Sequence, residues 1–446
     1  MSLGACCLIR RFLAVVIALC AILAFSSCGS SAPKTSNSGL PNRVLASQSV
    51  TSAGNFGALY IINGQIDTIP RVSPISAGNT PSTMAISPSR NIVAAFDSSS
   101  YSIYSVNTAT EKSIGSVRLP GCTLPPCPTP SFVVPTSNQV GYAAIPTATV
   151  NGFSFLGAVE VMNLAGGIVT TIAVTNAQTV VPASSGGQLL VFSNDSNSVT
   201  ILTPQNAVPP VDTSCLSGVS NSVCTVISGF DHPVNAVVNN NIAYILNCGP
   251  QCGGTQASVM ILDLSRLVVT AMIPVDAAYI GLLNGSTLYV AGTSPSSSNN
   301  TCTNQTTAAT TCGRLDTIDL TSNTVTSSLA ITDGYHNHID ISIDGQLFVG
   351  SYDCSEINNG DSSSGETRGC LTILNTNTGA LVFPPYNGEV DGLQSFTTRR
   401  VEYVAQGGIL YVYNTQYDLL LIDDYILTGE IVIVGYVGDV KAIDFF

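Results

Sequence analysis

The chain has 446 residues, of which 45% are hydrophobic and only 9% are charged, against about 25% charged residues in an ordinary soluble domain. The apolar fraction is sufficient for a packed core, so the bulk of the chain is not disordered, and the scarcity of charged helix-forming residues argues against a mostly helical architecture. Lys and Arg number 14 against 27 Asp and Glu, a net charge of −13, so we expect no nucleic-acid partner.

Residues 1–27 have the features of a signal peptide. Arg10 and Arg11 precede an apolar run of 14 residues, Phe12–Phe25, which is shorter than the ~20 residues of a membrane-spanning helix but suits a signal sequence. The following Ser26-Ser27-Cys28 resembles the lipobox of bacterial lipoproteins, which implies that Cys28 is acylated after cleavage. The alternative is an ordinary secretory signal that is cut nearby.

Residues 28–42 are rich in Ser, Asn, Gly and Pro, which is typical of a flexible tether. The residue after Cys28 is Gly29 instead of Asp, which in lipoproteins implies the outer membrane rather than the inner one. We therefore expect an exported protein, lipid-anchored to the outer membrane or cell surface and facing the periplasm or the exterior. The lipid anchor would be its only contact with the membrane.

Ten of the 14 cysteines are expected to form local disulfide bonds. Three others leave with the signal peptide and Cys28 is the anchor. The ten fall into five close pairs, as is typical of an exported chain with small disulfide loops. The pairs are Cys122 with Cys127, Cys215 with Cys224, Cys248 with Cys252, Cys302 with Cys312 and Cys354 with Cys370. The alternative for Cys248 and Cys252 is metal binding, but no second Cys/His pair lies at zinc-finger spacing.

From residue 43 onward a short strand followed at once by Asn or Asp recurs. The side chain of this Asn or Asp can form a hydrogen bond with the main chain two residues later and start a tight turn. The copies end at Asn63, Asn107, Asn163, Asp263, Asp319, Asn375 and Asp423, and an eighth copy ends at Thr203.

Around each copy the same order of strands is expected. A strand ends in a turn, a second strand such as LLVF, AYIL, LYVA, LFVG or ILYV follows, and a variable loop leads to the repeated strand. An outer strand closes the unit, for example from Lys112, Ile168, Val268 or Glu430. Four antiparallel strands in about 50 residues are the blade of a β-propeller.

The two ends of the chain supply complementary parts of one blade. Strands that start at Arg43, Ala58 and Ile69 lack an innermost strand, and Asp439–Phe446 is an innermost strand without followers. Sharing a blade in this way closes the ring and removes its exposed edges. We therefore predict an all-β fold, a single propeller over residues 43–446 with eight four-stranded blades; seven blades, with one long unit misread, is the alternative.

One unit carries a family resemblance. Gly78-Asn-Thr-Pro-Ser-Thr-Met-Ala-Ile-Ser-Pro-Ser89 and the two strands after it resemble the surface-layer type (YVTN) propeller repeat, with its Gly-x-x-Pro opening and Ser-Pro turn. Ser89-Arg90 replaces the Asp-Gly of that turn. The resemblance implies the fold and an extracellular setting; because the superfamily contains binding proteins, lactonases and copper reductases, it does not imply a function.

The longest loops are expected on one face of the ring. Loops between second and third strands share a face with the connections into the next blade, and four of the five cysteine pairs fall in these loops. Only the pair of Cys215 and Cys224 falls between third and fourth strands, which places it on the opposite face. Pro295–Arg314 and Tyr352–Arg368 are the two largest insertions. Rigid loops on a fixed scaffold commonly form binding sites, although exported loops are also pinned against proteolysis.

The three histidines are His232, His336 and His338. When the strands AYIL and LFVG are aligned, His232 and His336 occupy equivalent positions, each where an innermost strand begins. His336 and His338 are two residues apart and should share one side of their strand. With Asp231, Asp333 and Asp340 nearby, they are candidates for a metal or acid–base cluster across the channel. Structural histidines that line the channel are the favoured alternative.

No sequence signature of a serine-hydrolase elbow, a zinc protease or a phosphate loop is found, and Trp, which commonly stacks on sugars, is absent. We therefore favour a non-catalytic binding or scaffold module for an envelope protein or glycan, without a cofactor. The alternative is a metal-dependent hydrolase or oxidoreductase with its site at the central channel.

Overall fold

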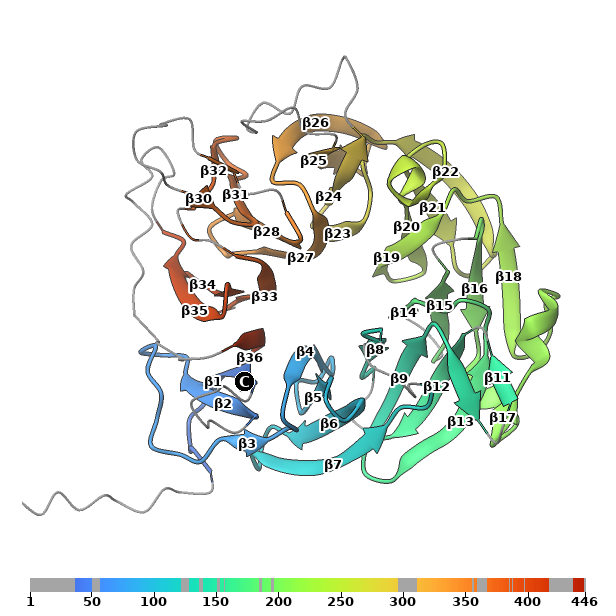
Figure 1. Ribbon diagram of the computed structural model, residues 1–446. Coiled ribbons are helices and arrows are strands. Elements are labelled where there is room, and N and C mark those ends of the chain that lie inside the picture. Colours follow the sequence, from blue (N-terminus) through green and yellow to red (C-terminus); the bar gives the residue numbers. More distant parts are fainter. Residues whose placement is uncertain are drawn as a thin grey trace, which may run out of the picture.

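The chain forms a ring of eight β-sheets (Figure 1), and we call the centre of this ring, which the innermost strands surround, the channel. The computed structural model describes residues 37–49, 57–121, 128–135, 139–150, 153–155, 157–183, 187–193, 196–295, 311–354, 357–358, 367–384, 386, 388–396, 398–416 and 436–444. Each sheet is a radial blade whose first strand lies at the channel and whose last strand lies at the rim. The prediction of an eight-bladed propeller is confirmed, and the alternative of seven blades is wrong.

The N-terminal half of the chain supplies most of blades 1 to 4, whose strands follow one another from the channel outward. Blade 1 contains β36 (Val437–Asp444), β1 (Asn42–Gln48), β2 (Ala58–Asn63) and β3 (Ile75–Ser76). Blade 2 contains β4 (Pro81–Ile86), β5 (Ile92–Asp97), β6 (Ser102–Asn107) and β7 (Lys112–Arg118). Blade 3 contains β8 (Ser131–Val133), β9 (Val140–Ile145), β12 (Ala158–Asn163) and β13 (Gly167–Ala173), to which β17 (Val211–Asp212) adds in parallel. A hairpin of β10 (Ala148–Val150) and β11 (Phe153–Phe155) lies between β9 and β12 in the chain. Blade 4 contains β14 (Thr179–Pro182), β15 (Leu189–Phe192), β16 (Ser198–Leu202) and β18 (Cys224–Ser228).

The other four blades complete the circle. Blade 5 contains β19 (Pro233–Asn239), β20 (Ile242–Asn247), β21 (Ser258–Asp263) and β22 (Val268–Pro274). Blade 6 contains β23 (Ile280–Asn284), β24 (Thr287–Pro295), β25 (Thr311–Asp319) and β26 (Thr324–Ile331). Blade 7 contains β27 (Tyr335–Ile341), β28 (Gln346–Tyr352), β31 (Leu371–Asn375) and β32 (Leu381–Val382), with a hairpin of β29 (Ile357–Asn358) and β30 (Thr367–Arg368). The described part of blade 8 contains β33 (Val390–Ser395), β34 (Val401–Gln406) and β35 (Ile409–Asn414).

Helical structure in these residues is limited to three short 3₁₀ turns, η1 (Pro204–Asn206), η2 (Ser214–Ser217) and η3 (Gly249–Cys252). Within the same residues, none of the helices is long and apolar enough to cross a membrane.

Blade 1 joins the two ends of the chain. β36 pairs antiparallel with β1, with Val44 opposite Ala442 and Asn42 opposite Asp444. Figure 1 shows β36 at the channel and β1 directly behind it. This arrangement confirms that the terminal strands share a blade. The ring therefore closes only when both ends of the chain are in place, because β36 comes from the C-terminal end and the other described strands of blade 1 come from the N-terminal end.

The core consists of a hydrophobic layer at each junction between neighbouring blades. In β1, Val44 packs toward blade 8 and Leu45 packs toward blade 2. Adjacent residues of a strand point to opposite faces of its sheet, so the strand supplies both junctions. Comparable clusters lie at the other junctions. The burial of both faces of each sheet explains why the strands are almost continuously apolar. An isolated blade would expose both of its apolar faces to water.

The repeated Asn or Asp residue starts the outer turn as the sequence indicates. The Asn63 side chain accepts a hydrogen bond from the main-chain N–H of Gln65 (3.0 Å). The equivalent bond is 3.0 Å for Asn163 and 2.9 Å for Asp319. These turns connect the third and fourth strands and set the register of the outer edge of the blade.

Two strand assignments made from the sequence are wrong. The strand expected from Ile69 is reduced to Ile75–Ser76, because Pro70 and Pro74 cannot donate to a sheet ladder. In blade 8, the segment ILYV is the third strand, not the second, since β34 precedes it through a two-residue turn at Gly407 and Gly408. The residue that ends the third strand there is Asn414, whereas Asp423 and the expected outer strand from Glu430 lie outside the described residues.

Candidate functional site

One face of the ring carries the connections that were expected to form a binding surface. We call it the loop face: it contains the segments between second and third strands and the connections into the next blade. Disulfide bonds brace two of these segments. Cys248 is bonded to Cys252 beside η3, and Cys354 is bonded to Cys370 between β28 and β31.

Neither of the other two disulfide bonds expected on the loop face lies wholly within the described part of the chain. Cys312 is disulfide-bonded, whereas its expected partner, Cys302, lies outside the described residues. Cys122 and Cys127, which were expected to bond to each other, also lie outside them. The pairing of Cys122 with Cys127 therefore stays a prediction, as does the pairing of Cys302 with Cys312.

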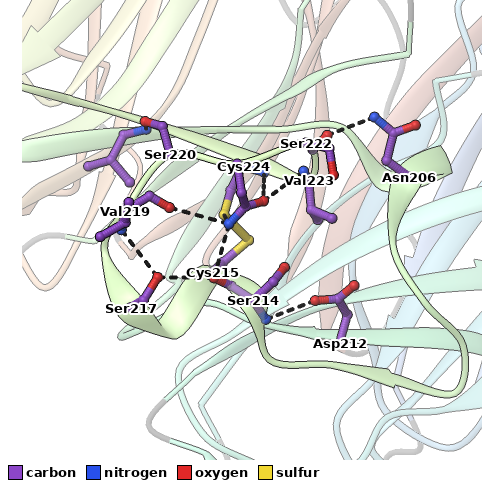
Figure 2. The surroundings of a disulfide bond; sticks show 12 residues. Asn206, Asp212, Ser214, Cys215, Ser217, Val219, Ser220, Ser222, Val223 and Cys224 are labelled. Atoms are coloured by element: carbon purple, nitrogen blue, oxygen red, sulfur yellow. Dashed lines mark hydrogen bonds between the residues drawn. A yellow bond between two sulfur atoms is a disulfide. The ribbon is translucent and has the colours of Figure 1, made fainter.

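The remaining described bond joins Cys215 to Cys224, with 5.8 Å between their Cα atoms. The two cysteines lie between the third and fourth strands of blade 4, as the sequence indicates, in a segment that also adds β17 to the rim of blade 3. Figure 2 shows the bond in this folded-back segment, where the main-chain N–H of Ser214 donates to Asp212 (2.8 Å) and the Asn206 amide donates to the carbonyl of Ser222 (2.7 Å). This disulfide therefore braces the outer junction of blades 3 and 4.

Three tyrosines from blades 6 and 7 form a cluster on the loop face, and two of them are exposed. Tyr335 and Tyr352 are directly opposite each other on β27 and β28, and their rings stack with centroids 5.1 Å apart and an interplanar angle of 20°. Tyr279, just before β23, meets the Tyr335 ring edge-on at 6.5 Å. Tyr335 is 45% exposed and Tyr352 is 38% exposed. We refer to Tyr279, Tyr335 and Tyr352 as the tyrosine cluster.

The backbone beneath the tyrosine cluster is fixed by close packing. Gly334 has a φ of +93°, and a Cβ atom there would lie 2.5 Å from the carbonyl oxygen of Tyr352. The Thr293 hydroxyl donates to the carbonyl of Gly334 (2.5 Å) and thereby ties blade 6 to blade 7. Since Cys354 follows Tyr352 by two residues, the disulfide bond to Cys370 anchors the same segment. The rings are therefore presented on a rigid support.

Next to the tyrosine cluster is an open pocket of about 430 Å³, lined by Glu389, Asp391, Gly407, Gly408 and Tyr436. We call this the acidic pocket. Glu389 precedes β33, Tyr436 precedes β36, and the two glycines join β34 to β35, so the pocket lies on the loop face at blades 8 and 1. Gly388 and Gly407 pack back to back, since a Cβ atom on Gly388 would lie 2.5 Å from the Cα atom of Gly407.

The pocket and the tyrosine cluster are contiguous. The main-chain N–H of Asp353, next to Tyr352, donates to Glu389 (3.2 Å). Burial, followed by the charges of neighbours that include Glu389, raises the pKa of Tyr352 to about 12. Tyr352 is therefore an uncharged ring throughout the physiological pH range.

Within the pocket, Tyr436 donates a hydrogen bond to Asp391 (3.3 Å). Burial and then the charge of Glu389 raise the pKa of Asp391 to about 7, and Asp439 adds to this effect. Two carboxyl groups therefore share this pocket, and Asp391 gives up its proton only near neutral pH.

The histidines do not form the cluster considered from the sequence. His336 is completely buried, its Nε2 lies 2.9 Å from the carbonyl oxygen of Thr332, and its Nδ1 lies 3.5 Å from the Thr293 hydroxyl. Burial lowers its pKa to about 4, so the ring is neutral.

His338 points the other way, toward Val390 and Lys441, and burial lowers its pKa to about 3. The expectation that His336 and His338 share one side of the strand is wrong, because a β-bulge between them shifts the register.

His232 lies in blade 5, where its Nδ1 is 3.0 Å from Asp231. Asp231 also accepts hydrogen bonds from the main chain and hydroxyl of Thr255, at 2.8 and 2.7 Å, so it braces the loop that holds Cys248 and Cys252. Among the residues that the structure describes, no group of three or more His, Cys, Asp or Glu side chains is arranged to hold a metal ion.

The other acidic candidates also lie apart. Asp333 is buried beside His336. Asp340 accepts a hydrogen bond from the main-chain N–H of Ser395 in blade 8 (2.7 Å), and burial raises its pKa. Asp340 thus joins blades 7 and 8, whereas Asp333 stays beside His336 within blade 7.

The sequence predicted the loop face but not the tyrosine cluster or the acidic pocket. A signal for the tyrosine cluster was present, since the turn at Ser342–Gly345 fixes the register that sets Tyr335 opposite Tyr352. No comparable signal existed for the acidic pocket, because it depends on the correct assignment of the turn at Gly407 and Gly408.

Comparisons with known proteins indicate only the fold. No protein-family model and no curated protein sequence matches the chain. Among solved structures, the chain resembles a dihydro-heme d1 dehydrogenase, NirN, solved in complex with DHE, with a TM-score of 0.53 and 12% identity, over 88% of this chain and 74% of that one.

Hydrazine synthase of Kuenenia stuttgartiensis matches at a TM-score of 0.44 and 14% identity, over 78% of this chain and 80% of that one. BamB from Moraxella catarrhalis matches at a TM-score of 0.45 and 11% identity, over 83% of this chain and 90% of that one. These proteins include enzymes as well as BamB, so similarity of fold does not select a function. The chain is a β-propeller protein.

Proposed function

We propose that this chain is an exported lipoprotein of the bacterial cell envelope, anchored at Cys28 in the outer membrane or cell surface, whose propeller acts as a non-catalytic binding module. Its partner is an envelope protein or glycan, and binding takes place on the loop face at the tyrosine cluster. The apolar stretch of residues 12–25 and the lipobox-like segment before Cys28 support export and anchoring. The resemblance of residues 78–89 to the YVTN repeat of surface-layer proteins agrees with an extracellular location.

The observation that carries the binding proposal is the exposure of two stacked tyrosines on a braced support. Tyr335 and Tyr352 are 45% and 38% exposed, although aromatic side chains usually gain free energy by burial. Tyrosine is enriched at interfaces because its ring supplies contact area while its hydroxyl forms hydrogen bonds. Little conformational entropy is lost when a partner binds such a support, since the strands and the disulfide bond already hold the rings in place.

Site-specific photocrosslinking in intact cells of the producing bacterium tests this proposal. A photoreactive amino acid is placed at Tyr335, at Tyr352 or at Ile343. Ile343 is 56% exposed in the turn at the opposite end of β27 and β28, so it is a matched control in the same blade. We expect one discrete adduct from both tyrosine positions and none from Ile343. No adduct from the tyrosine positions, or the same adducts from Ile343, would overturn the proposal.

A further inference from the structure

We propose that the partner is a protein and that the acidic pocket and the tyrosine cluster together bind a segment of it that bears Lys or Arg. This inference rests on the proposed binding function and assigns the chemistry of its ligand. In the complex, one cationic side chain enters the acidic pocket between Glu389 and Asp391, and the adjoining part of the segment lies across Tyr352 and Tyr335.

The polar groups of the acidic pocket match a ligand that only donates hydrogen bonds. The carboxylates of Glu389 and Asp391 are acceptors, and the hydroxyl of Tyr436 already donates to Asp391. Guanidinium and ammonium groups carry donors and no acceptor, whereas a sugar hydroxyl brings both. The lining side chains therefore favour a basic side chain over a neutral glycan.

The charge around the pocket also lacks a partner. No lysine or arginine is among the described residues that line it. Lys441, the cation nearby on β36, lies 3.5 Å from Asp439, whose side chain is almost completely buried. A ligand cation would offset the repulsion between Glu389 and Asp391, and a charge-assisted hydrogen bond to a carboxylate is roughly twice as strong as a neutral one.

The tyrosine cluster supplies the second part of the recognition. The face of an aromatic ring attracts Lys and Arg side chains, by about 0.5–1 kcal/mol at exposed sites. The bond from Asp353 to Glu389 places the pocket beside Tyr352. One extended basic segment can therefore contact the pocket and the rings at the same time.

Isothermal titration calorimetry on the mature, non-reduced protein with Cys28 replaced tests the inference. The probes are the capped peptide Gly-Arg-Gly-Lys-Gly-Arg, the same peptide with citrulline and acetyl-lysine in place of Arg and Lys, and the neutral chitin tetrasaccharide. The test variant combines Glu389→Gln with Asp391→Asn. The control is Asp319→Asn, which removes an acidic group from a turn on the opposite face, where Asn107, Asn163 and Asn375 occupy the equivalent positions in other blades.

We expect the basic peptide to bind the wild-type protein and the Asp319→Asn variant equally, and to bind the double variant at least tenfold more weakly. The uncharged peptide should not bind, and added salt should weaken the binding of the basic peptide. An equal thermal midpoint for all variants would show that they are folded. Separate Tyr335→Leu and Tyr352→Leu variants should weaken peptide binding while the carboxylates stay in place.

Failure of the basic peptide to bind, or equal binding to the double variant, would overturn the inference. Binding of the tetrasaccharide alone, lost in the tyrosine variants, would also overturn it but would leave the binding function intact. The photocrosslinking experiment tests that function independently, because it does not depend on the chemistry of the ligand.

Discussion

Glu160 on β12 should make the stability of the propeller depend on pH. Its side chain is completely buried at the junction of blades 2 and 3. The Thr171 hydroxyl donates to one carboxyl oxygen (2.7 Å), and the other accepts no hydrogen bond from the described residues. Burial raises the pKa of Glu160 from its ordinary value of 4.5 to about 7, against the smaller, opposite effect of Thr171.

The size of the effect follows from proton linkage. Between about pH 4.5 and pH 7 the folded protein holds a proton on Glu160 that the unfolded chain has released. The contribution of this group to stability is therefore fully present below about pH 4.5 and is lost as the pH rises through about 7. A gap of about 2.5 pH units, at about 1.4 kcal/mol per unit, corresponds to a loss of about 3 kcal/mol.

The variant Glu160→Gln cannot ionise and should not show this loss. We expect its free energy of unfolding, relative to wild type, to rise by about 3 kcal/mol between about pH 4 and about pH 8. Urea denaturation of the non-reduced protein at several pH values measures it. The Asp319→Asn variant is the control, because hydrogen bonds from Thr321 and Ser322 lower the pKa of that carboxyl, so its replacement should give no such rise. A constant difference between Glu160→Gln and wild type across this range would refute the reasoning.

Three further predictions concern the disulfide bond beside the tyrosines, the junction between blades 8 and 1, and the closing strand. Replacing Cys354 and Cys370 with Ser releases a loop with a sequence separation of 16 residues and should cost about 3 kcal/mol; an unchanged thermal midpoint would contradict this. Arg399→Met should cost about 3 kcal/mol, because Asp67, which accepts two bonds from Arg399 at 2.6 and 2.8 Å, is left buried without its cation and keeps the hydrogen bond from the Tyr403 hydroxyl. Adding Asp67→Asn should recover part of the loss in urea denaturation, whereas strictly additive losses would show that the pair is not coupled. Ending the chain after Tyr436 removes β36 and should abolish cooperative unfolding by circular dichroism; a native-like transition would show that ring closure is dispensable.

The fold could be predicted because its signals are local and repeated. The Asn or Asp after the third strand bonds the main chain two residues on in blades as far apart as those of Asn63 and Asn375. The order of strands within a blade follows from this turn and from strand alternation. The complementary terminal strands then required a ring, and an eight-bladed ring with one shared blade is observed.

The errors arose where one or two residues change a register. Two glycines with positive φ, Gly407 and Gly408, make a tight turn in blade 8 where a variable loop was expected, so the sequence assigns the strand that starts at Ile409 as the second strand although it is the third. A single bulge turns His338 away from His336. Neither change has a periodic signal in the sequence, since each depends on how one residue fits against its neighbours.

From the sequence, only the face of the ring that carries the candidate site could be predicted, not the residues that form it. The cysteine pairs indicate which loops are pinned, and three disulfide bonds are found among the described residues. The side chains of the site come instead from the starts of innermost strands, such as Tyr335 and Glu389, and from the end of a second strand at Tyr352. Their contact depends on the distance between neighbouring blades, which the sequence of any one blade does not contain.

Oxidative footprinting by hydroxyl radicals, with mass spectrometry, tests the central claim most directly, namely that the tyrosine cluster is the binding surface. Labelling is compared between intact cell envelopes and the purified protein. We predict that Tyr335 and Tyr352 are oxidised several times more slowly in the envelope, while Met272, which is 54% exposed on the outer strand of blade 5, is oxidised at the same rate in both. Equal oxidation of the two tyrosines in both samples would contradict the account.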